Sequence, residues 1–156
     1  MRALAHQVVG GGLSKVVLLH PLGSSKAFFT DVCSLVSSSL NVQLLALDAR
    51  GMGDSEMGAE ETGEDWSWTD LASDVVKLAD KVFGEHEQFA VVGVSMGGML
   101  IQHMVKQYSH RVRSAVLCST TSSTRGQEDM WKQRFAALQG HKTLPKDLVE
   151  VGSIFS

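Results

Sequence analysis

The stretch Gly93-Val94-Ser95-Met96-Gly97-Gly98 decides the fold, because it joins an apolar run, Phe89–Val92, to a long amphipathic segment that begins at Met99. This order predicts a strand, a sharp turn and a helix, with Ser95 at the turn. Glycines two residues before and after the serine let strand and helix crowd together while the serine takes strained backbone angles. Ser95 is therefore the candidate nucleophile, at a helix start that favours developing negative charge. The alternative is a glycine-rich turn with an incidental serine.

Two other polar loops follow predicted strands in the same way. The apolar run Lys15–Leu19 leads into His20–Ser25, and the run Val42–Leu47 leads into Asp48–Ser55. Ligands of open parallel sheets bind at the carboxyl ends of the strands. The three loops are therefore expected to border one crevice.

Strands and helices alternate along the chain. A last strand is expected over 114–118. Three helices are expected: one over 25–40, one that begins at the capping-box-like Ser67-Trp68-Thr69-Asp70, and one over 99–112. This alternation predicts an α/β fold, a mostly parallel sheet with helices on both faces. The side chains expected to face inward from the first of these helices are Phe28, Val32, Leu35 and Val36.

Three motifs, in this order, resemble those of the α/β-hydrolase fold family. They are His20-Pro21-Leu22-Gly23, Asp48-Ala49-Arg50-Gly51-x-Gly53-x-Ser55 and Gly93-Val94-Ser95-Met96-Gly97-Gly98. The chain looks like the amino-terminal half to two-thirds of a carboxylesterase, haloperoxidase or 3-oxoadipate enol-lactonase. The resemblance implies a serine hydrolase that forms an acyl-enzyme at Ser95 with a small-molecule ester or lactone.

The resemblance also implies roles for the residues around Ser95. The backbone N–H groups of Leu22 and Met96 would form the oxyanion hole, and Pro21 stands where the family commonly has glycine. Gly93 and Gly97 would shape the turn. His20, Asp48 and Arg50 are interpreted as loop supports, in preference to proton transfer or direct contact with substrate.

The acid and the histidine that the family places after its late strands are not found in the chain. His103 and His110 fall on the helix that follows the turn at Ser95, which we call the elbow. Among the histidines present, His141, in the segment that resembles the start of the family's cap, is the best substitute for the missing base. Loss of triad members costs about 10⁶ in turnover. We therefore expect a truncated or partial hydrolase that is nearly inactive alone. Residues 1–122 are expected to form a partial core, and residues 123–156 the start of a helical cap or a C-terminal extension.

Other members of the fold leave alternatives open. A non-catalytic relative that binds a small ligand would use the same crevice, and an acyltransferase or thioesterase would share the same parts. A further expectation concerns Ser114–Cys118. If this strand lies at an open edge of the sheet, its unpaired backbone groups would favour self-association.

Composition limits the remaining functions. Of the 156 residues, 44% are hydrophobic and 20% charged, which is ordinary for a globular domain. A net charge of −3 gives no case for binding nucleic acid or an anionic membrane. No signal peptide or spanning segment is visible, so a cytoplasmic protein is predicted. No cofactor or metal site is predicted, and Cys33 and Cys118 are expected to be reduced thiols.

Overall fold

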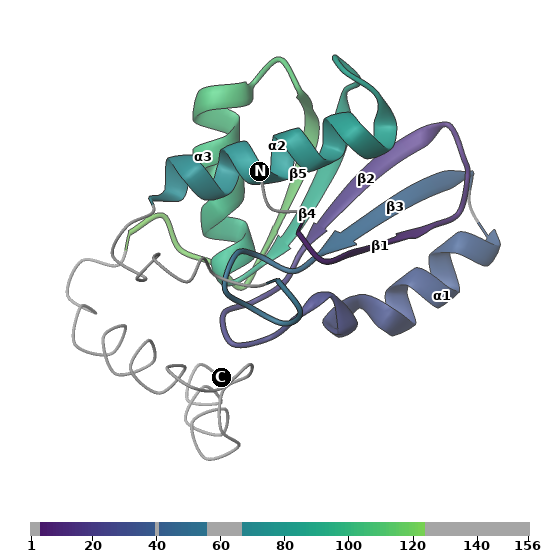
Figure 1. Cartoon of the computed structure of the whole chain (residues 1–156), viewed down its shortest axis with the longest axis horizontal. Helices are drawn as coiled ribbons and strands as arrows, with labels where there is room; N and C mark the ends of the chain where they lie inside the picture. The colour runs from purple at the N-terminus through teal and green to yellow at the C-terminus, as the bar shows by residue number, and fades with distance from the viewer. Residues whose placement is uncertain (1–3, 40, 56–66, 124–156) are drawn as a thin grey trace.

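A five-stranded sheet organises the computed structural model, which describes residues 4–39, 41–55 and 67–123 (Figure 1). The strands lie in the order β1-β3-β2-β4-β5. β1 runs antiparallel to β3, and the other neighbours are parallel. The predicted α/β fold with a mostly parallel sheet is therefore confirmed. The strand bounds are β1 His6–Val9, β2 Ser14–Leu19, β3 Val42–Leu47, β4 Phe89–Val94 and β5 Val112–Cys118.

The register of the parallel strands brings the polar loops to one edge of the sheet. Leu19, the last residue of β2, pairs with Leu47 of β3 on one side and with Gly93 of β4 on the other. The loops that follow these strands therefore start from neighbouring positions.

Helices cover both faces of the sheet. A 3₁₀ helix, η1 (Lys26–Phe29), continues into α1 (Thr30–Ser39) on one face, while α2 (Trp68–Phe83) and α3 (Met96–Tyr108) lie on the other (Figure 1). α2 begins with a capping box, in which Ser67 and Asp70 bind each other's backbone N–H groups. The predicted start of this helix is therefore confirmed.

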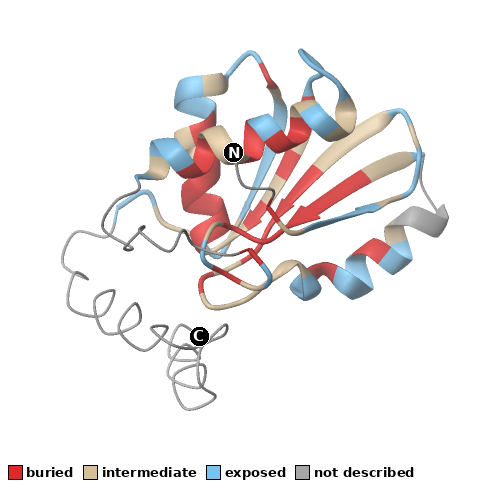
Figure 2. Ribbon diagram, viewed as in Figure 1, coloured by how far each residue is buried: buried red, intermediate tan, exposed pale blue. Residues whose placement is uncertain are grey.

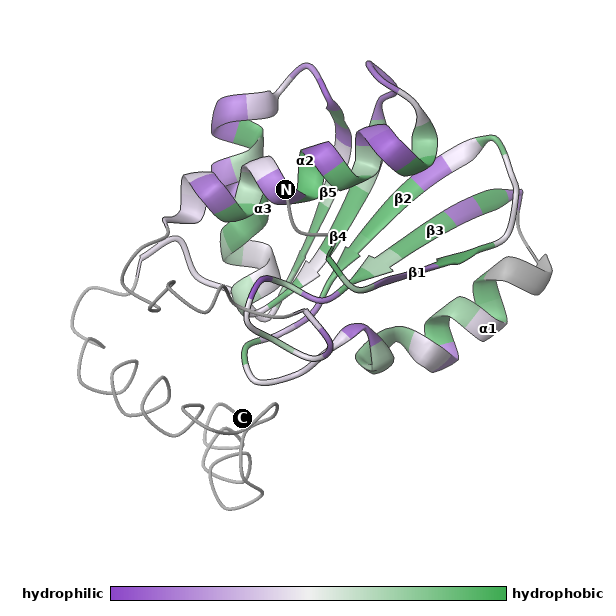
Figure 3. Cartoon of the chain, viewed as in Figure 1, coloured by the Kyte–Doolittle hydropathy of each residue, from purple (hydrophilic) through white to green (hydrophobic). Residues whose placement is uncertain are grey.

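Two apolar layers fill the space between sheet and helices. The larger joins β2, β3 and β4 to α2 and α3, and the smaller lies under α1. Figure 2 shows the buried residues along the central strands, and Figure 3 shows that these strands are also the hydrophobic ones. The largest side chains among the almost fully buried residues include Phe89, Leu45, Leu47, Leu100, Ile101 and Met104.

The structure corrects the predicted limits of several elements. α3 begins at Met96 instead of Met99 and ends at Tyr108, and Val112 is already the first residue of β5. β1 was not predicted, because a four-residue strand with three exposed residues carries almost no apolar pattern. His6 is the first residue of this strand.

The predicted inward face of η1 and α1 is wrong at three of its four residues. Phe28, Val32 and Leu35 are 51%, 44% and 70% exposed, while Phe29 and Cys33 are buried. The fourth residue, Val36, is partly buried and packs against the smaller apolar cluster, as predicted. Phe28 and Val32 are four residues apart, and so are Phe29 and Cys33, so periodicity alone cannot decide which pair faces the sheet.

β5 forms one edge of the sheet within the described ranges, where it pairs with β4 alone. Val116 and Leu117, which point to opposite faces, are both about half exposed, at 51% and 48%. The expected apolar edge is therefore present in this part of the chain, and self-association through it stays a prediction. No helix among the described residues has the length and apolarity needed to cross a bilayer.

Candidate active site

Ser95 occupies the turn between β4 and α3 in a strained conformation. Its φ of 52° and ψ of −111° put a residue with a Cβ in a region that favours glycine. The glycines around it leave no room for side chains: a Cβ on Gly97 would lie 2.2 Å from the Leu19 carbonyl oxygen. A Cβ on Gly93 would lie 2.5 Å from the carbonyl carbon and oxygen of Gly97. Strand and helix therefore approach each other as closely at this turn as the sequence predicts, and only glycine fits at positions 93 and 97.

The hydroxyl of Ser95 is partly exposed and unengaged. It makes no capping bond to the helix that it precedes, and no hydrogen bond joins it to any residue in the described ranges. The backbone of Ser95, in contrast, is held by the end of β5, because its N–H donates to the Cys118 carbonyl at 2.9 Å. An anchored backbone with a free Oγ is the arrangement that an attacking hydroxyl needs.

The two candidate oxyanion donors lie in one apolar cluster. Leu22 and Met96 are both buried, and they pack with Ala49 and Met52 against Trp68. Met96 is the first residue of α3, so its N–H lies at the positive end of the helix. Within the described part of the chain, neither the Leu22 nor the Met96 N–H donates a hydrogen bond. Both N–H groups are therefore unpaired within the described residues.

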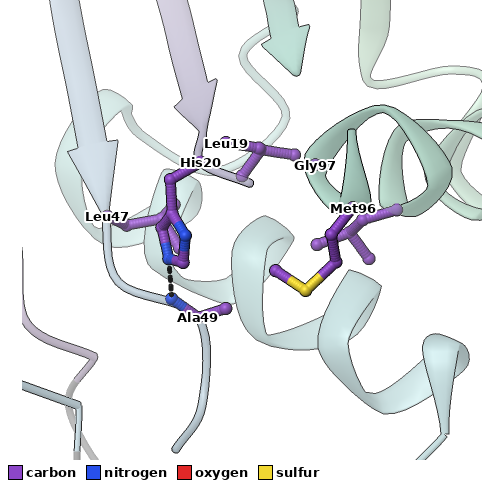
Figure 4. Close-up of a pocket in the computed structure, with 7 residues that line it drawn as sticks. Leu19, His20, Leu47, Ala49, Met96 and Gly97 are labelled. Carbon is purple, nitrogen blue, oxygen red and sulfur yellow. Dashed lines mark hydrogen bonds between the residues drawn. The ribbon is translucent and has the colours of Figure 1, made fainter. Parts of the chain in front are cut away.

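His20 is buried at the head of the loop that carries Leu22, and its ring nitrogens are both engaged. Nδ1 lies 2.8 Å from the Pro21 carbonyl, and Nε2 accepts the Ala49 N–H at 3.0 Å (Figure 4). Burial lowers the pKa of His20, although the bond to Pro21 works in the other direction. A neutral imidazole with no spare nitrogen fixes two loops and offers Ser95 no base.

A small apolar cavity lies where these loops meet the elbow (Figure 4). Its lining comes from the ends of β2 and β3 and from the first turns of α3. Because the His20 ring nitrogens are already bonded, the cavity presents almost no polar group to a ligand. The lining residues are Leu19, His20, Leu47, Ala49, Met96, Gly97 and Leu100.

Asp48 is completely buried and gathers donors from two loops. Its carboxylate accepts the backbone N–H and the Nζ of Lys26 and the backbone N–H of Asp54, the last two at 2.8 Å. Hydrogen bonds to Asp48 and then to Asp54 raise the pKa of Lys26. Gly53, with φ of 55°, passes so close that a Cβ would lie 2.4 Å from the Asp48 carboxylate. The motif therefore closes around one carboxylate.

The same loop is tied to two other elements. Arg50 binds the Asp74 carboxylate of α2 through Nε at 2.9 Å and through a terminal nitrogen at 2.7 Å. Ser55 donates to the Asp48 carbonyl and accepts the N–H of Ala5, next to β1. These bonds fasten the loop 48–55 to α2 on one side and to the segment before β1 on the other.

No histidine or carboxylate of the described residues hydrogen-bonds to the Ser95 hydroxyl. His103 stacks on Trp68, with ring centroids 5.4 Å apart and planes 10° apart, and burial lowers its pKa. His110 is exposed at the far end of α3. His141 and the expected cap over 123–156 lie outside the described residues, except for Ser123.

Sequence reasoning missed Thr120, which lies in the polar loop after β5. Its hydroxyl donates to the Ser95 carbonyl at 2.7 Å. Its place directly after a parallel strand was the available signal. Among the described residues, His, Cys, Asp and Glu side chains form no cluster of three that could hold a metal ion.

Comparison with known proteins places this fold and site in a family. The model of the alpha/beta hydrolase family matches residues 16–153, and the chain therefore belongs to that family. The resemblance inferred from the three motifs is confirmed.

The matches to individual relatives span most of this chain but only a part of each relative's own length. A Bacillus subtilis (strain 168) protein, provisionally named as a 2-succinyl-6-hydroxy-2,4-cyclohexadiene-1-carboxylate synthase, is 31% identical over 68% of the chain and 36% of its own length. An enol-lactonase from Burkholderia xenovorans LB400 matches with a TM-score of 0.72 and 23% identity, over 89% of this chain and 51% of that one. An esterase from a marine microorganism matches with a TM-score of 0.71 and 19% identity, over 87% of this chain and 50% of that one.

The chain thus spans about half the length of these solved structures and about a third of the curated relative. At identities below 25%, the two structures establish the shared fold and nothing about substrate.

Proposed function

We propose that this chain carries the nucleophile and the oxyanion donors of a serine hydrolase that acts on carboxylic esters or lactones. The Ser95 hydroxyl attacks the carbonyl carbon, its proton passes to a general base, and the alcohol leaves with a proton. Water then releases the acid from the acyl-enzyme. The observation that carries this proposal is the strained Ser95, whose free Oγ follows a glycine-shaped turn at the start of α3.

The environment of Ser95 supports acyl transfer in a second way. The attack creates an oxyanion, which backbone N–H groups at a helix start stabilise, and one such donor contributes about 10² to 10³ in turnover. The free N–H groups of Met96 and Leu22 can fill this role. The substrate class that we propose, a small-molecule ester or lactone, is the one in the names of the esterase and the enol-lactonase that share this fold.

The described residues supply no base for Ser95, so we expect the chain to turn over slowly. A serine hydrolase without its triad partners still keeps about 10³ to 10⁴ over water through its oxyanion hole and substrate binding. Reaction at Ser95 is therefore expected to be weak but dependent on the fold.

A second candidate function comes from the Bacillus subtilis relative, which is named as a synthase of a cyclohexadiene carboxylate. In that case the site would hold a ring carboxylic acid in place of an ester or lactone. A non-catalytic ligand-binding relative, or an acyltransferase or thioesterase, would use the same fold.

A fluorophosphonate probe tests the hydrolase proposal. We expect slow covalent labelling that peptide mapping assigns to Ser95, faster in the folded chain than in urea, and absent in Ser95→Ala. Ser109→Ala, which changes an exposed serine at the other end of α3, should label like the wild type.

Labelling spread over several serines, or equal rates in folded and unfolded protein, would show that Ser95 is not activated. Binding of a cyclohexadiene carboxylate that survives Ser95→Ala, without labelling, would favour the second candidate.

A further inference from the structure

The conformation of Ser95 has to be imposed by its surroundings. A non-glycine residue in such a region costs on the order of 1–3 kcal/mol and persists only where neighbouring groups hold it. The glycines of the turn make the conformation sterically possible, but they do not fix the orientation of the peptide group that follows Ser95. Hydrogen bonds to its carbonyl do so.

The Ser95 carbonyl accepts two hydrogen bonds from different elements. One is the first bond of α3, from the Met99 N–H at 3.1 Å. The other comes from the Thr120 hydroxyl, across 25 residues of chain, at 2.7 Å. The second bond is the shorter, and it approaches from the loop after β5.

The structure makes room for Thr120 at this position. A Cβ on Gly98 would lie 2.6 Å from the Thr120 Cβ and 2.7 Å from both its methyl carbon and its hydroxyl oxygen. Ser119, with φ of 45°, makes the turn that follows β5. Gln102 of α3 then holds the loop by donating to the Thr121 carbonyl at 2.9 Å. Thr120 therefore lies against the first turn of α3, and the residues before and after it hold it there: Ser119 through its turn and Thr121 through its bond to Gln102.

The bond to Thr120 has a consequence for Met96 because a peptide group is planar. The Ser95 carbonyl and the Met96 N–H belong to one rigid unit and point in opposite directions. Fixing the oxygen therefore fixes the direction of the N–H. Hydrogen bonds in a chain also polarise one another, so a bonded carbonyl makes its N–H a stronger donor.

We propose that Thr120 is a positioning residue: its hydroxyl aims and polarises the Met96 N–H by binding the Ser95 carbonyl. The proposal rests on the proposed hydrolase function, in which the Met96 N–H is an oxyanion donor. Thr120 acts through the Ser95–Met96 peptide.

Two substitutions of Thr120 separate the effect of its hydroxyl from that of its bulk. Thr120→Val keeps the shape that fits against Gly98 and removes the hydroxyl, whereas Thr120→Ser keeps the hydroxyl and removes the methyl. Thr121→Val is the matched control, because the Thr121 hydroxyl bonds within its own loop, to Ser123. Thr120→Ala serves in place of Thr120→Val if circular dichroism shows that the valine variant does not fold.

The first measurement needs no activity. In NMR spectra of the full chain, Thr120→Val should move the Ser95 carbonyl carbon and the Met96 amide proton upfield, as expected when a hydrogen bond to that peptide is lost. Thr120→Ser should restore both resonances, and Thr121→Val should leave them unchanged. The second measurement is the rate of fluorophosphonate labelling at Ser95. It should fall about tenfold in Thr120→Val, less than the 10² to 10³ for loss of a whole donor, and recover in Thr120→Ser.

Unchanged Ser95 and Met96 resonances in Thr120→Val would overturn the proposal, as would shifts of equal size in Thr121→Val. Shifted resonances with an unchanged labelling rate would also overturn it, because the peptide would then not matter to the reaction. If the wild type is not labelled, the proposed function fails, and the NMR result alone decides whether Thr120 orients the peptide.

Discussion

The two segments that contribute to the small cavity, the turn around Ser95 and the loop 48–55, are built by opposite means. The turn around Ser95 depends on missing side chains, since a Cβ on Gly93 or Gly97 would meet backbone atoms. The loop 48–55 depends on side chains that are present, since its carboxylate, guanidinium and hydroxyl groups bind three other segments. A turn made by close packing of backbone tolerates no added atom, whereas a loop held by hydrogen bonds loses stability bond by bond.

The largest effect is expected for Gly97→Ala, which tests the steric half of this comparison. The new Cβ would lie 2.2 Å from the Leu19 carbonyl oxygen, and backbone on both sides cannot yield as a side chain would. Overpacking costs about 1–3 kcal/mol where side chains can move, so we expect a loss above about 3 kcal/mol in urea unfolding. Gly11→Ala is the control, because nothing lies within 4 Å of its Cβ position. Equal stability of the two variants would contradict a sterically closed elbow.

A smaller loss is expected for Asp48→Asn, which tests the polar half. The substitution removes the charge that Lys26 faces and turns one acceptor into a donor aimed at other donors. Breaking a buried ion pair from one side costs about 3–5 kcal/mol, and exposure of Lys26 to solvent places this case at the lower end.

The matched control is Asp54→Asn, which changes the other carboxylate bound to the same Lys26 nitrogen. Its side chain is 70% exposed, so its loss should cost less than about 1 kcal/mol. Chemical unfolding of both variants should show the difference, and a larger loss for Asp54→Asn would refute the central role of the buried carboxylate.

The smallest effect, a pH dependence, concerns His20, which joins the loop after β2 to the loop 48–55. Because burial lowers the pKa of His20, the unfolded chain binds a proton at this residue before the folded chain does. Stability should therefore be constant above the ordinary imidazole pKa of about 6.5 and fall as the pH drops below it, by up to about 1.4 kcal/mol per pH unit. Unfolding midpoints between pH 7 and 5 should show this slope. His20→Asn should reduce the slope. His103, whose pKa is also lowered by burial, contributes equally to the wild type and to the variant. An unreduced slope in His20→Asn would contradict the assignment of the pH dependence to His20.

The sequence predicted the elbow better than it predicted the loop that faces it. Glycine spacing around Ser95 is a local pattern, and it indicated the turn even though the contact that requires Gly97 is with the distant Leu19. Asp48 and Arg50 were identified as loop supports, but their partners Lys26 and Asp74 lie 22 and 24 residues away. No local pattern indicates a pairing of that kind. Thr120 was missed for the same reason. Three of the four residues predicted to face inward from η1 and α1 are exposed, because apolar residues repeat at helical spacing on two neighbouring stripes.

The dependence of Ser95 on β5 also orders events during synthesis of the chain. Ser95 leaves the ribosome 25 positions ahead of Thr120, which at about 5–20 residues per second is a delay of about 1–5 s. Until Cys118 and Thr120 arrive, the N–H and the carbonyl of Ser95 lack the partners that β5 and its loop provide. In the proposed function, the serine is therefore synthesised seconds before the contacts that orient its peptide groups can form.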